Sequence, residues 1–436
     1  MAEPVSPEIA YLLSLQAVRD RSRLVLQAAK EGALNSFDYD EPRMSEVANV
    51  VIDIIKRDFG PDRYAEIPPH GRWQHFNVGG IDRVGALLAQ WSSEGQDKLE
   101  QTRRLLDLFF VSVLVDAGVG DKWTFKEPDS DRVYSRSEGT AVASLYMFKA
   151  GCFSSKKEKP HSVDSAALQG VTEEIFCQQF QITSENPMVG VASRVKLWNA
   201  VGQQLHNNDP KIFGAEGRPG SMVDYLIASA KEPNTLDYTD LWSVLQGVLI
   251  PSWPKERTHL AGNPIGDAWP LKVLADRAQR EGDSSEAAAI APFHKLTQWL
   301  GYSLLIPLTR VLGIKVINDN LGTGLPEYRN GGLFYDLGAL KLKPKVLEAG
   351  QRASGQDLPL YPATGDTIVE WRAMTVALLD ELHRLVSAHF EKEGVKLNLA
   401  QMLEAGSWLG GRELAAKLRP ETKSSPILFE GDGTLF

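Results

Sequence analysis

The chain has 436 residues, 43% of them hydrophobic and 24% charged, which are the proportions of an ordinary globular protein. Its formal net charge of −9 argues against a protein whose main task is to bind a nucleic-acid backbone. The two cysteines, Cys152 and Cys177, lie outside any CxxC or Cys/His spacing, so the sequence predicts neither a disulfide framework nor a structural zinc site.

Helical patterns dominate the N-terminal part of the chain. Residues 6–8, Ser-Pro-Glu, have the order of an N-cap, a favourable first residue and an early acid, and they predict a helix that Gly32 ends. Ser45 predicts the start of a second helix, whose apolar residues lie on one face as far as Gly60.

The most apolar run of the chain, LLDLFFVSVLV at 105–115, is about half as long as a membrane span and contains Asp107. The N-terminal sequence MAEPVSPEIAYLL carries an acid where a signal peptide has its basic region. We therefore expect a cytoplasmic protein, with the nucleus as the alternative location, and neither a membrane nor a nucleic acid as its partner.

Two irregular segments interrupt the helical pattern in the middle of the chain. The segment HNNDPKIFGAEGRPG at 206–220 is rich in turn formers, and it predicts a surface loop or a junction between subdomains. The segment LIPSWPKERTHLAGNPIGDAWP at 249–270 contains four prolines and two tryptophans. Because tryptophans in such a loop usually pack down, it predicts either a well-anchored loop or the wall of a pocket.

Strand signals are few and short, GIKVI at 313–317 and LFYDL at 333–337 being the best. Thr367 and Glu370 have the spacing of a capping box and predict a helix that runs toward Gly394. Because strands and helices do not alternate, we expect no doubly wound sheet. We predict a mainly α fold: a multi-helical single domain over residues 1–436 with a few short strands. Two lobes with a junction near 206–236 are the alternative.

The common motifs for phosphate, cofactor and metal sites do not occur. The sequence contains no GxxxxGK[ST], no GxGxxG after a strand, no HExxH and no GxSxG, and its eight histidines are dispersed. We therefore predict neither a metal site nor a cofactor.

Carboxylates and aromatic residues in unusual settings are the remaining candidates. Asp116 ends the most apolar run, where a carboxylate is costly unless it meets a partner, and Trp123 follows closely. Trp123 either stacks on a planar ligand or lies in the core behind an Asp116 that caps a turn.

Two further clusters have both a functional and a structural interpretation. Arg136 and Glu138 precede a helix of small residues, and they form either an anion site or a surface ion pair. In GRWQHF at 71–76, Trp73 and His75 line a site or belong to the core.

Glu327 stands in TGLPEYRNGGLFYDLGAL at 323–340. Pro326 restricts the backbone before it, and Gly331 and Gly332 are expected to let the chain turn tightly and admit a ligand close to the backbone. Such a carboxylate is held rigidly and suits developing positive charge in a transition state. A solvated turn or a capped helix start is the alternative.

Several segments resemble one known family, in order and through almost the whole chain: GRWQHFNVGG, VDAGVGDKWTF, SRSEGTAVASLYMFKAGCFSS, FQITSENPMVGVASRVKLW, TGLPEYRNGGLFYDLGAL and the C-terminal DGTLF. The family is that of the fourth uracil-catabolism protein of fungi and bacteria, formerly a domain of unknown function. The resemblance implies a role in a pathway that degrades uracil through its ribonucleotide, with a ring-opened ribosylurea as intermediate and urea as product.

A remoter resemblance links the chain to the queuosine salvage family, nucleoside-phosphate N-glycosidases with a mainly helical fold related to DNA glycosylases. EYRNGGLFYDLGAL at 327–340 is similar to that family's DYRVPQxLRxLGxL, EWRAMTVALLDEL at 370–382 to its EIRAxT helix, and FHKLTQ at 293–298 to its YKRAQ. This register places Glu327 on the catalytic Asp and Lys295 on the Lys of YKRAQ. The change of Asp to Glu and of VPQ to NGG implies a different leaving group.

Together the resemblances imply an N-glycosidase that hydrolyses a ribosylurea phosphate, or a related uracil-derived nucleotide, to urea and ribose phosphate. Glu327 and Asp116 are the expected catalytic residues, with Asp116, Glu138 or Asp267 protonating the leaving nitrogen. The expected substrate-binding residues are Trp73, His75, Trp123, Arg136, Glu138, Arg194, Asp267, Lys295, Tyr328, Arg329 and Asn330. Among them, Arg136, Arg194, Lys295 and Arg329 are the candidates for the phosphate.

Two other functions are compatible with the sequence. One is an amidohydrolase or ring-opening enzyme of the same pathway, which would leave the N-ribosyl bond intact. The other is a helical protein without enzymatic activity that binds a pathway partner through an exposed apolar patch. The sequence does not predict the oligomeric state.

Overall fold

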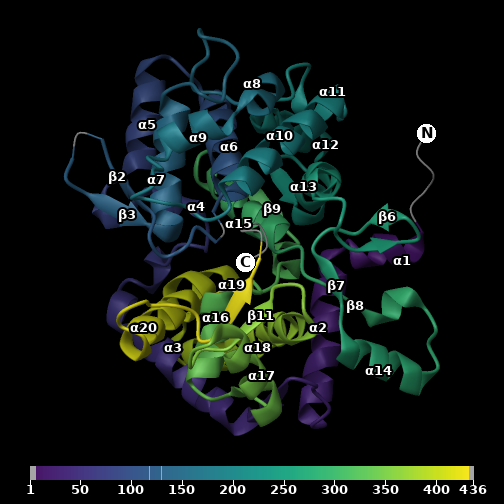
Figure 1. Ribbon diagram of the computed structural model, residues 1–436. Helices are drawn as coiled ribbons and strands as arrows, with labels where there is room; N and C mark the ends of the chain where they lie inside the picture. The colour runs from purple at the N-terminus through teal and green to yellow at the C-terminus, as the bar shows by residue number, and fades with distance from the viewer. Residues whose placement is uncertain (1–5, 117, 129, 432–436) are drawn as a thin grey trace.

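A computed structural model describes residues 6–116, 118–128 and 130–431 of the chain, and it confirms the mainly helical fold (Figure 1). The DGTLF segment at 432–436 and the acid at position 3 lie outside the described residues. Among the helices that are described, none has the length and apolar character needed to cross a bilayer.

The first part of the described chain forms seven α-helices. They are α1 (Pro7–Leu12), α2 (Leu15–Lys30), α3 (Met44–Phe59), α4 (Arg72–Phe76), α5 (Arg83–Ser93), α6 (Lys98–Leu114) and α7 (Arg136–Lys149). The middle part forms α8 (Ser165–Gly170), α9 (Glu173–Gln179), α10 (Val191–Asn207), α11 (Pro210–Phe213), α12 (Met222–Ser229), α13 (Tyr238–Ser252) and α14 (Lys272–Glu281).

The last part forms α15 (Lys295–Arg310), α16 (Tyr328–Asp336), α17 (Pro344–Ser354), α18 (Asp366–Phe390), α19 (Leu399–Met402) and α20 (Trp408–Leu418). A π-helical segment, η8 (Leu403–Ser407), joins α19 to α20. Short 3-10 turns complete the helical elements: η1 (Glu41–Arg43), η2 (Tyr64–Glu66), η3 (Val78–Gly80), η4 (Pro219–Ser221), η5 (Glu286–Ala289), η6 (Asp319–Leu321) and η7 (Glu391–Glu393).

The strands are two or three residues long and occur in isolated pairs. Antiparallel pairs join β1 (Phe37–Tyr39) to β10 (Leu340–Leu342), β2 (Thr124–Lys126) to β3 (Val133–Ser135), β5 (His259–Leu260) to β6 (Asn263–Pro264) and β7 (Ala268–Pro270) to β8 (Ile290–Pro292). Parallel pairs join β4 (Thr235–Asp237) to β9 (Lys315–Ile317) and β11 (Leu360–Pro362) to β12 (Leu428–Glu430).

Several local predictions differ from the structure. The strand predicted at 333–337 is wrong, because this segment lies in α16, whose buried residues include Leu333 and Phe334. The first predicted helix is broken after Leu12, since Ser14 caps a new helix by accepting the N–H of Ala17. The second begins one residue before Ser45, directly after a 3-10 turn.

The predicted capping box at Thr367 and Glu370 is also wrong. The Glu370 carboxylate is buried and accepts hydrogen bonds from the backbone N–H groups of Asn35, Ser36 and Phe37, at 2.8, 2.8 and 3.1 Å. The hydrogen-bond partners of Glu370 therefore lie more than 300 positions away in the sequence, and the local spacing of Thr367 and Glu370 does not determine its role. The strand prediction at 313–317, in contrast, is confirmed by β9.

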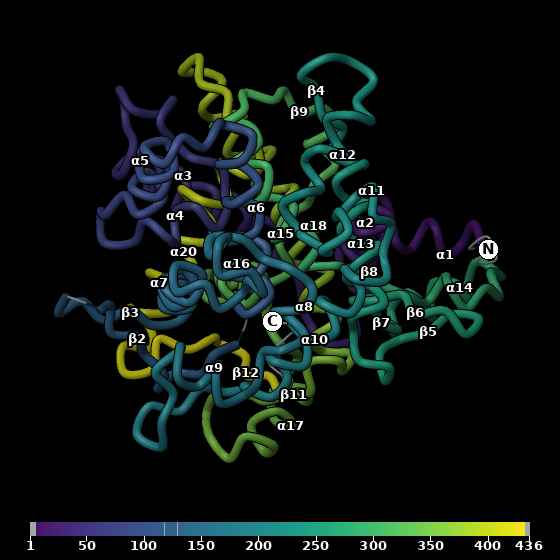
Figure 2. The backbone as a smooth tube through the Cα atoms, turned by 90° about the horizontal axis from the view of Figure 1, so that it is seen from above, coloured from purple at the N-terminus to yellow at the C-terminus, as the bar shows by residue number. Residues whose placement is uncertain are grey.

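The helices gather in two groups with α15 between them (Figure 1). Helices α5–α13 lie in the upper half of the view and α3 with α16–α20 in the lower half, while α14 and β7–β8 project beside α1. Seen from above, α15 and α18 lie in the middle of the molecule (Figure 2). Buried apolar residues from Leu15 to Ile427 form one main core cluster. The choice between one domain and two lobes with a junction near 206–236 stays a prediction.

A buried ion pair joins the segments on one side of this arrangement. Arg372 of α18 donates two hydrogen bonds of 2.8 Å to Asp267, and its Nε donates to the Pro326 carbonyl at 3.4 Å. Asp267 also accepts the backbone N–H of Lys295 at 3.0 Å and the indole N–H of Trp269 at 2.8 Å. One pair therefore ties α18 to the β7–β8 hairpin, to the start of α15 and to the residue before Glu327.

A second buried arginine holds the other side. Arg72 of α4 donates to the Ser112 hydroxyl and carbonyl of α6 at 2.9 and 3.2 Å, and to the Thr140 hydroxyl of α7 at 2.9 Å. It donates to Asp116, which follows α6, at 2.5 Å. Its side chain is completely buried, so these partners replace the water that the guanidinium loses.

The Asp267–Arg372 pair generates a stability prediction. Asp267→Ala leaves the Arg372 charge buried beside a void, and we expect it to lower the free energy of unfolding by about 3–5 kcal/mol. Asp276→Ala, which breaks the exposed ion pair with Lys272, is the control and should cost about 0–1 kcal/mol. Urea denaturation of the two variants and the parent chain measures both values. Equal losses in the two variants would contradict the structural role of the buried pair.

Candidate active site

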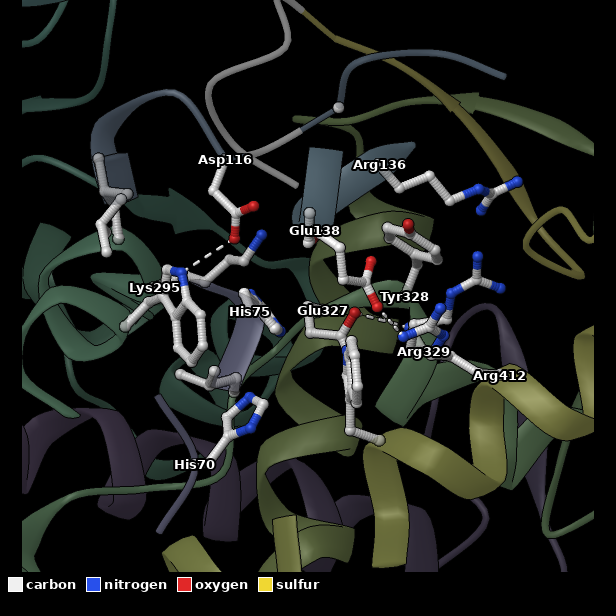
Figure 3. Close-up of a pocket in the computed structure, with 17 residues that line it drawn as sticks. His70, His75, Asp116, Arg136, Glu138, Lys295, Glu327, Tyr328, Arg329 and Arg412 are labelled. Carbon is white, nitrogen blue, oxygen red and sulfur yellow. Dashed lines mark hydrogen bonds and ion pairs between the residues drawn. The ribbon is translucent and has the colours of Figure 1, made fainter. Parts of the chain in front are cut away.

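A cavity opens between the starts of α15 and α16, against α4, the start of α7 and α20. Figure 3 draws its lining side chains. The space between its walls is about 790 Å³, part of it open to solvent. Its lining combines charged and aromatic side chains: His70, His75, Val113, Asp116, Gly118, Arg136, Ser137, Glu138, Lys295, Leu296, Trp299, Leu325, Glu327, Tyr328, Arg329, Trp408 and Arg412.

Glu327 is the N-cap of α16 and faces this cavity. One carboxylate oxygen accepts the backbone N–H of Arg329 at 2.8 Å, and the other accepts that of Asn330 at 2.6 Å. Burial raises the pKa of Glu327, while these two amides and the charge of Lys295 oppose the rise. Glu327 therefore caps the start of α16 and also presents its carboxylate to the cavity, so these two interpretations of the sequence hold together. The solvated turn is wrong, because only 8% of the residue is exposed.

Asp116 and Lys295 lie close together in the cavity (Figure 3). Asp116 accepts hydrogen bonds from Arg72 at 2.5 Å and from the Trp299 indole at 3.0 Å. Burial alone would raise the pKa of Asp116, but the neighbouring cations, Arg72 first, lower it to about 2. Burial lowers the pKa of Lys295 to about 8, opposed by Glu327 and Asp116. At neutral pH the site thus contains an ionised Asp116 and a mostly protonated Lys295.

Three arginines lie on the Tyr328 side of the cavity (Figure 3). Arg136 donates to Asp121 at 2.9 Å, Arg329 donates to the Lys423 carbonyl at 3.0 Å, and Arg412 forms an ion pair with Glu138. Burial would raise the pKa of Glu138, but the ion pair with Arg412 helps to keep it below its ordinary value. The cluster of guanidinium groups suits a ligand with a phosphate.

Four rings form the aromatic wall of the cavity. The His70 ring lies 4.6 Å from Trp299 and 5.9 Å from Trp408, and the His75 ring lies 5.5 and 5.4 Å from the same tryptophans. The Arg412 guanidinium lies over the Trp408 ring at 4.6 Å. Such a wall favours a flat group of the ligand.

The tautomer of His75 follows from its neighbour Arg72. The guanidinium can only donate, so the 3.2 Å contact of Arg72 Nη1 with His75 Nδ1 makes Nδ1 an acceptor. Burial and the Arg72 charge also lower the pKa of His75, and the neutral ring carries its proton on Nε2. This buried N–H has no hydrogen-bond partner among the described residues, so a carbonyl oxygen of a ligand would satisfy it.

The cavity brings most of the predicted site residues together. Its lining includes Asp116, His75, Arg136, Glu138, Lys295, Glu327, Tyr328 and Arg329. The other predicted residues are buried elsewhere: Trp73 against Phe109, Trp123 bonded to the Phe180 carbonyl, Arg194 within α10, Asp267 on Arg372, and Asn330 on Ser407 and the Leu325 carbonyl. Arg329 therefore faces the cavity, whereas Asn330 holds the loop.

Gly331, the first of the two glycines after Asn330, has a different role from the predicted one. Gly331 lies inside α16, where a Cβ atom would come within 2.8 Å of the Thr375 hydroxyl and of the Trp371 ring. It lets α16 approach α18 instead of admitting a ligand. In the same way, a Cβ on Gly411 would lie 2.0 Å from the Arg329 carbonyl oxygen, so this glycine lets α20 approach α16.

Several cavity residues were not predicted from the sequence: His70, Ser137, Trp299, Trp408 and Arg412. They come from segments far apart in the chain, and only Ser137 lies in a segment that the sequence analysis singled out, between Arg136 and Glu138. The one usable signal is the pair Gly410–Gly411, which marks a close helix contact directly before Arg412.

An outer cavity adjoins the first and shares Asp116, Gly118, Arg136, Ser137 and Tyr328 with it. Its other walls come from the segment after Gly118, from Val189 and Ala363, and from the C-terminal segment at 424–431. Tyr328 and Phe429 meet there, with ring centroids 6.1 Å apart. This space provides a route between the cavity and solvent.

The lowered pKa of Asp116 predicts how stability depends on pH. A carboxyl whose pKa falls from 3.8 to about 2 on folding stabilises the folded protein at pH values above its pKa in the unfolded chain. This contribution is lost as the pH falls through about 2. The shift corresponds to about 2 kcal/mol. We expect Asp116→Asn to flatten the pH dependence of the unfolding free energy in this window. The exposed Asp62→Asn should leave it unchanged, and identical pH profiles for all three proteins would contradict the assignment.

Comparison with known proteins identifies the family of the chain. Residues 11–436 match the model of a family described as "Protein of unknown function (DUF1688)". The chain is 47% identical to the protein urg3 of Schizosaccharomyces pombe over 429 residues, which cover 98% of this chain and 99% of the relative. It is 42% identical to the uracil catabolism protein 4 of Lachancea kluyveri over 446 residues, which cover 99% of this chain and 100% of the relative. The chain therefore belongs to the DUF1688 family of uracil-catabolism proteins, which confirms the first of the two resemblances.

Proposed function

We propose that this protein acts in uracil catabolism as an N-glycosidase, which hydrolyses a ribosylurea phosphate or a closely related uracil-derived nucleotide to urea and a ribose phosphate. The name of the Lachancea kluyveri relative supports the pathway. The observation that carries the proposed reaction is the position of Glu327: a buried carboxylate, fixed by two backbone amides at a helix start, that faces a cavity lined by arginines.

Glu327 has the properties that cleavage of an N-ribosidic bond requires. As this bond breaks, positive charge develops on C1 and the ring oxygen of the sugar, and a nearby carboxylate stabilises it. The two amide hydrogen bonds hold the carboxylate in place, so that little reorganisation is needed at the moment of reaction. In our proposal Glu327 also orients the attacking water and accepts its proton.

The remaining side chains suit the other parts of the proposed substrate. Arg136, Arg329 and Arg412 would bind the phosphate, for which a guanidinium offers two parallel donors. The Nε2–H of His75 would donate to the ureido oxygen, while Trp299 and Trp408 would flank the planar ureido group. The ionised Asp116 can only accept hydrogen bonds, so it would bind a ureido N–H or a ribose hydroxyl.

Removal of the Glu327 charge tests the proposed reaction. We expect Glu327→Gln to lower kcat for urea release from ribosylurea phosphate by about 10²–10³-fold, since the transition state loses its main anionic partner. Asp97→Asn is the matched control, because Asp97 caps α6 with the same kind of hydrogen bond and does not line the cavity. Urea and reducing sugar phosphate are both assayed. Undiminished urea release by Glu327→Gln would contradict the proposal.

Arg136→Gln tests whether the substrate carries a phosphate. A hydrogen bond to a charged group contributes about 1.5–3 kcal/mol, so we expect KM for the phosphorylated substrate to rise at least about tenfold. KM for ribosylurea without phosphate should stay unchanged in this variant. Arg352→Gln, an exposed position on α17, serves as the control. An equal rise of KM for both substrates would show that Arg136 does not bind the phosphate.

A further inference from the structure

The proposed reaction requires a proton donor for the leaving nitrogen, and the three carboxyl groups expected in this role do not suit it. Arg72 holds Asp116 in its ionised form, and the ion pair with Arg412 favours the ionised form of Glu138. Arg372 binds both oxygens of Asp267, which does not line the cavity. Each of these groups is an acceptor at neutral pH, so the proton comes from elsewhere.

A histidine–carboxylate pair lies at the cavity wall. His70 Nδ1 is 2.5 Å from the carboxylate of Glu404. The His70 side chain is buried, with 3% exposed, and that of Glu404 is partly buried, with 13% exposed. A carboxylate accepts, so the proton of this contact belongs to Nδ1 of the imidazole. The pair leaves Nε2 as the nitrogen that can exchange a proton with a ligand. His70 lines the same cavity as Glu327 (Figure 3).

The surroundings fix the orientation of this pair. The His70 ring lies against Trp299 at 4.6 Å and against Trp408 at 5.9 Å. Its backbone N–H donates to the Ala400 carbonyl at 2.9 Å. Glu404 belongs to the π-helical segment η8, and single π-helical turns occur often at functional sites because they redirect side chains. Here the π-helix places Glu404 toward His70 and leads directly into α20, which carries Trp408 and Arg412.

We propose that His70 donates the proton to the leaving nitrogen and that Glu404 positions it. This inference rests on the proposed glycosidase function. The bond between C1 of the ribose and the ureido nitrogen breaks, its electron pair passes to the nitrogen, and the Nε2 proton of His70 forms the new N–H bond. Water adds to C1 and gives its proton to Glu327, and this proton returns to His70 through solvent, so that one water is consumed in each turnover.

The other basic residues of the cavity suit this step less well. The Arg72 guanidinium donates to His75 Nδ1 and disfavours a positive charge on that ring, so His75 is a hydrogen-bond donor without a proton to spare. The ammonium charge of Lys295 interacts with both Glu327 and Asp116, so donation of the Lys295 proton would destabilise the ionised forms of both carboxylates. His70, in contrast, contacts the Glu404 carboxylate directly through Nδ1, and this contact leaves its Nε2 for the ligand.

Two substrates with different leaving groups test this inference. Ribosylurea phosphate needs protonation of its leaving nitrogen, whereas the nitrophenolate of nitrophenyl ribofuranoside phosphate departs without a proton. We expect His70→Gln to lower kcat for ribosylurea phosphate by about 10²–10⁴-fold and for the nitrophenyl substrate by less than about tenfold. Glu327→Gln should impair both reactions, because both pass through the same sugar cation.

Glu404→Gln provides the readout for positioning and a second variant in case His70→Gln folds poorly. It should show the same selective loss to a smaller degree and a shifted pH profile of kcat. Equal losses of both reactions in the His70 and Glu404 variants would overturn the inference, as would a selective loss in Lys295→Gln instead. If Glu327→Gln retains both activities, the proposed function itself fails, and this outcome differs from every pattern caused by His70 alone.

Discussion

The pair between Asp267 and Arg372 is the interaction on which the architecture of the cavity depends. Two short hydrogen bonds bury both charges, and the remaining donors and acceptors of the pair bind the backbone of Lys295 and the carbonyl of Pro326. The hydrogen bond to the Lys295 backbone fixes the start of α15. The hydrogen bond to the Pro326 carbonyl fixes the backbone directly before Glu327. Two cavity residues that lie 32 positions apart in the chain thereby receive fixed positions from one pair that does not line the cavity.

The other half of the cavity is built on the same physical principle. Burying a charge is costly, so Arg72 is surrounded by acceptors from α6, α7 and Asp116, and its remaining contact determines the tautomer of His75. The consequence for chemistry is a division of roles. Carboxylates paired with arginines stay ionised and can only accept, whereas Glu327 is held by two backbone amides and His70 contacts the Glu404 carboxylate. Burial raises the pKa of Glu327 and lowers that of Lys295 to about 8, so burial favours the neutral form of each of these two residues.

Part of this picture could be predicted from the sequence. Apolar spacing and start signals predict α3 and the long helix α18, and β9 follows from its short apolar run. Glu327, Asp116 and the residues around them were identified because they interrupt apolar or glycine-rich segments. The role of Glu370 could not be predicted, since its partners lie at Asn35–Phe37, nor could the assignment of 333–337 to a helix that Glu327 caps. His70, Trp299 and Arg412 carry no local signal, because only the packing of α4, α15 and α20 brings them to one wall.

The central claim is that water attacks the sugar carbon and not the ureido carbon, and oxygen-18 labelling tests it most directly. The protein is incubated with ribosylurea phosphate in labelled water, and the products are reduced at short times to trap the sugar before its anomeric oxygen exchanges. Our account predicts one labelled oxygen at C1 of the reduced sugar phosphate and unlabelled urea. Label in a product derived from the ureido carbonyl, with the N-ribosyl bond intact, would contradict it.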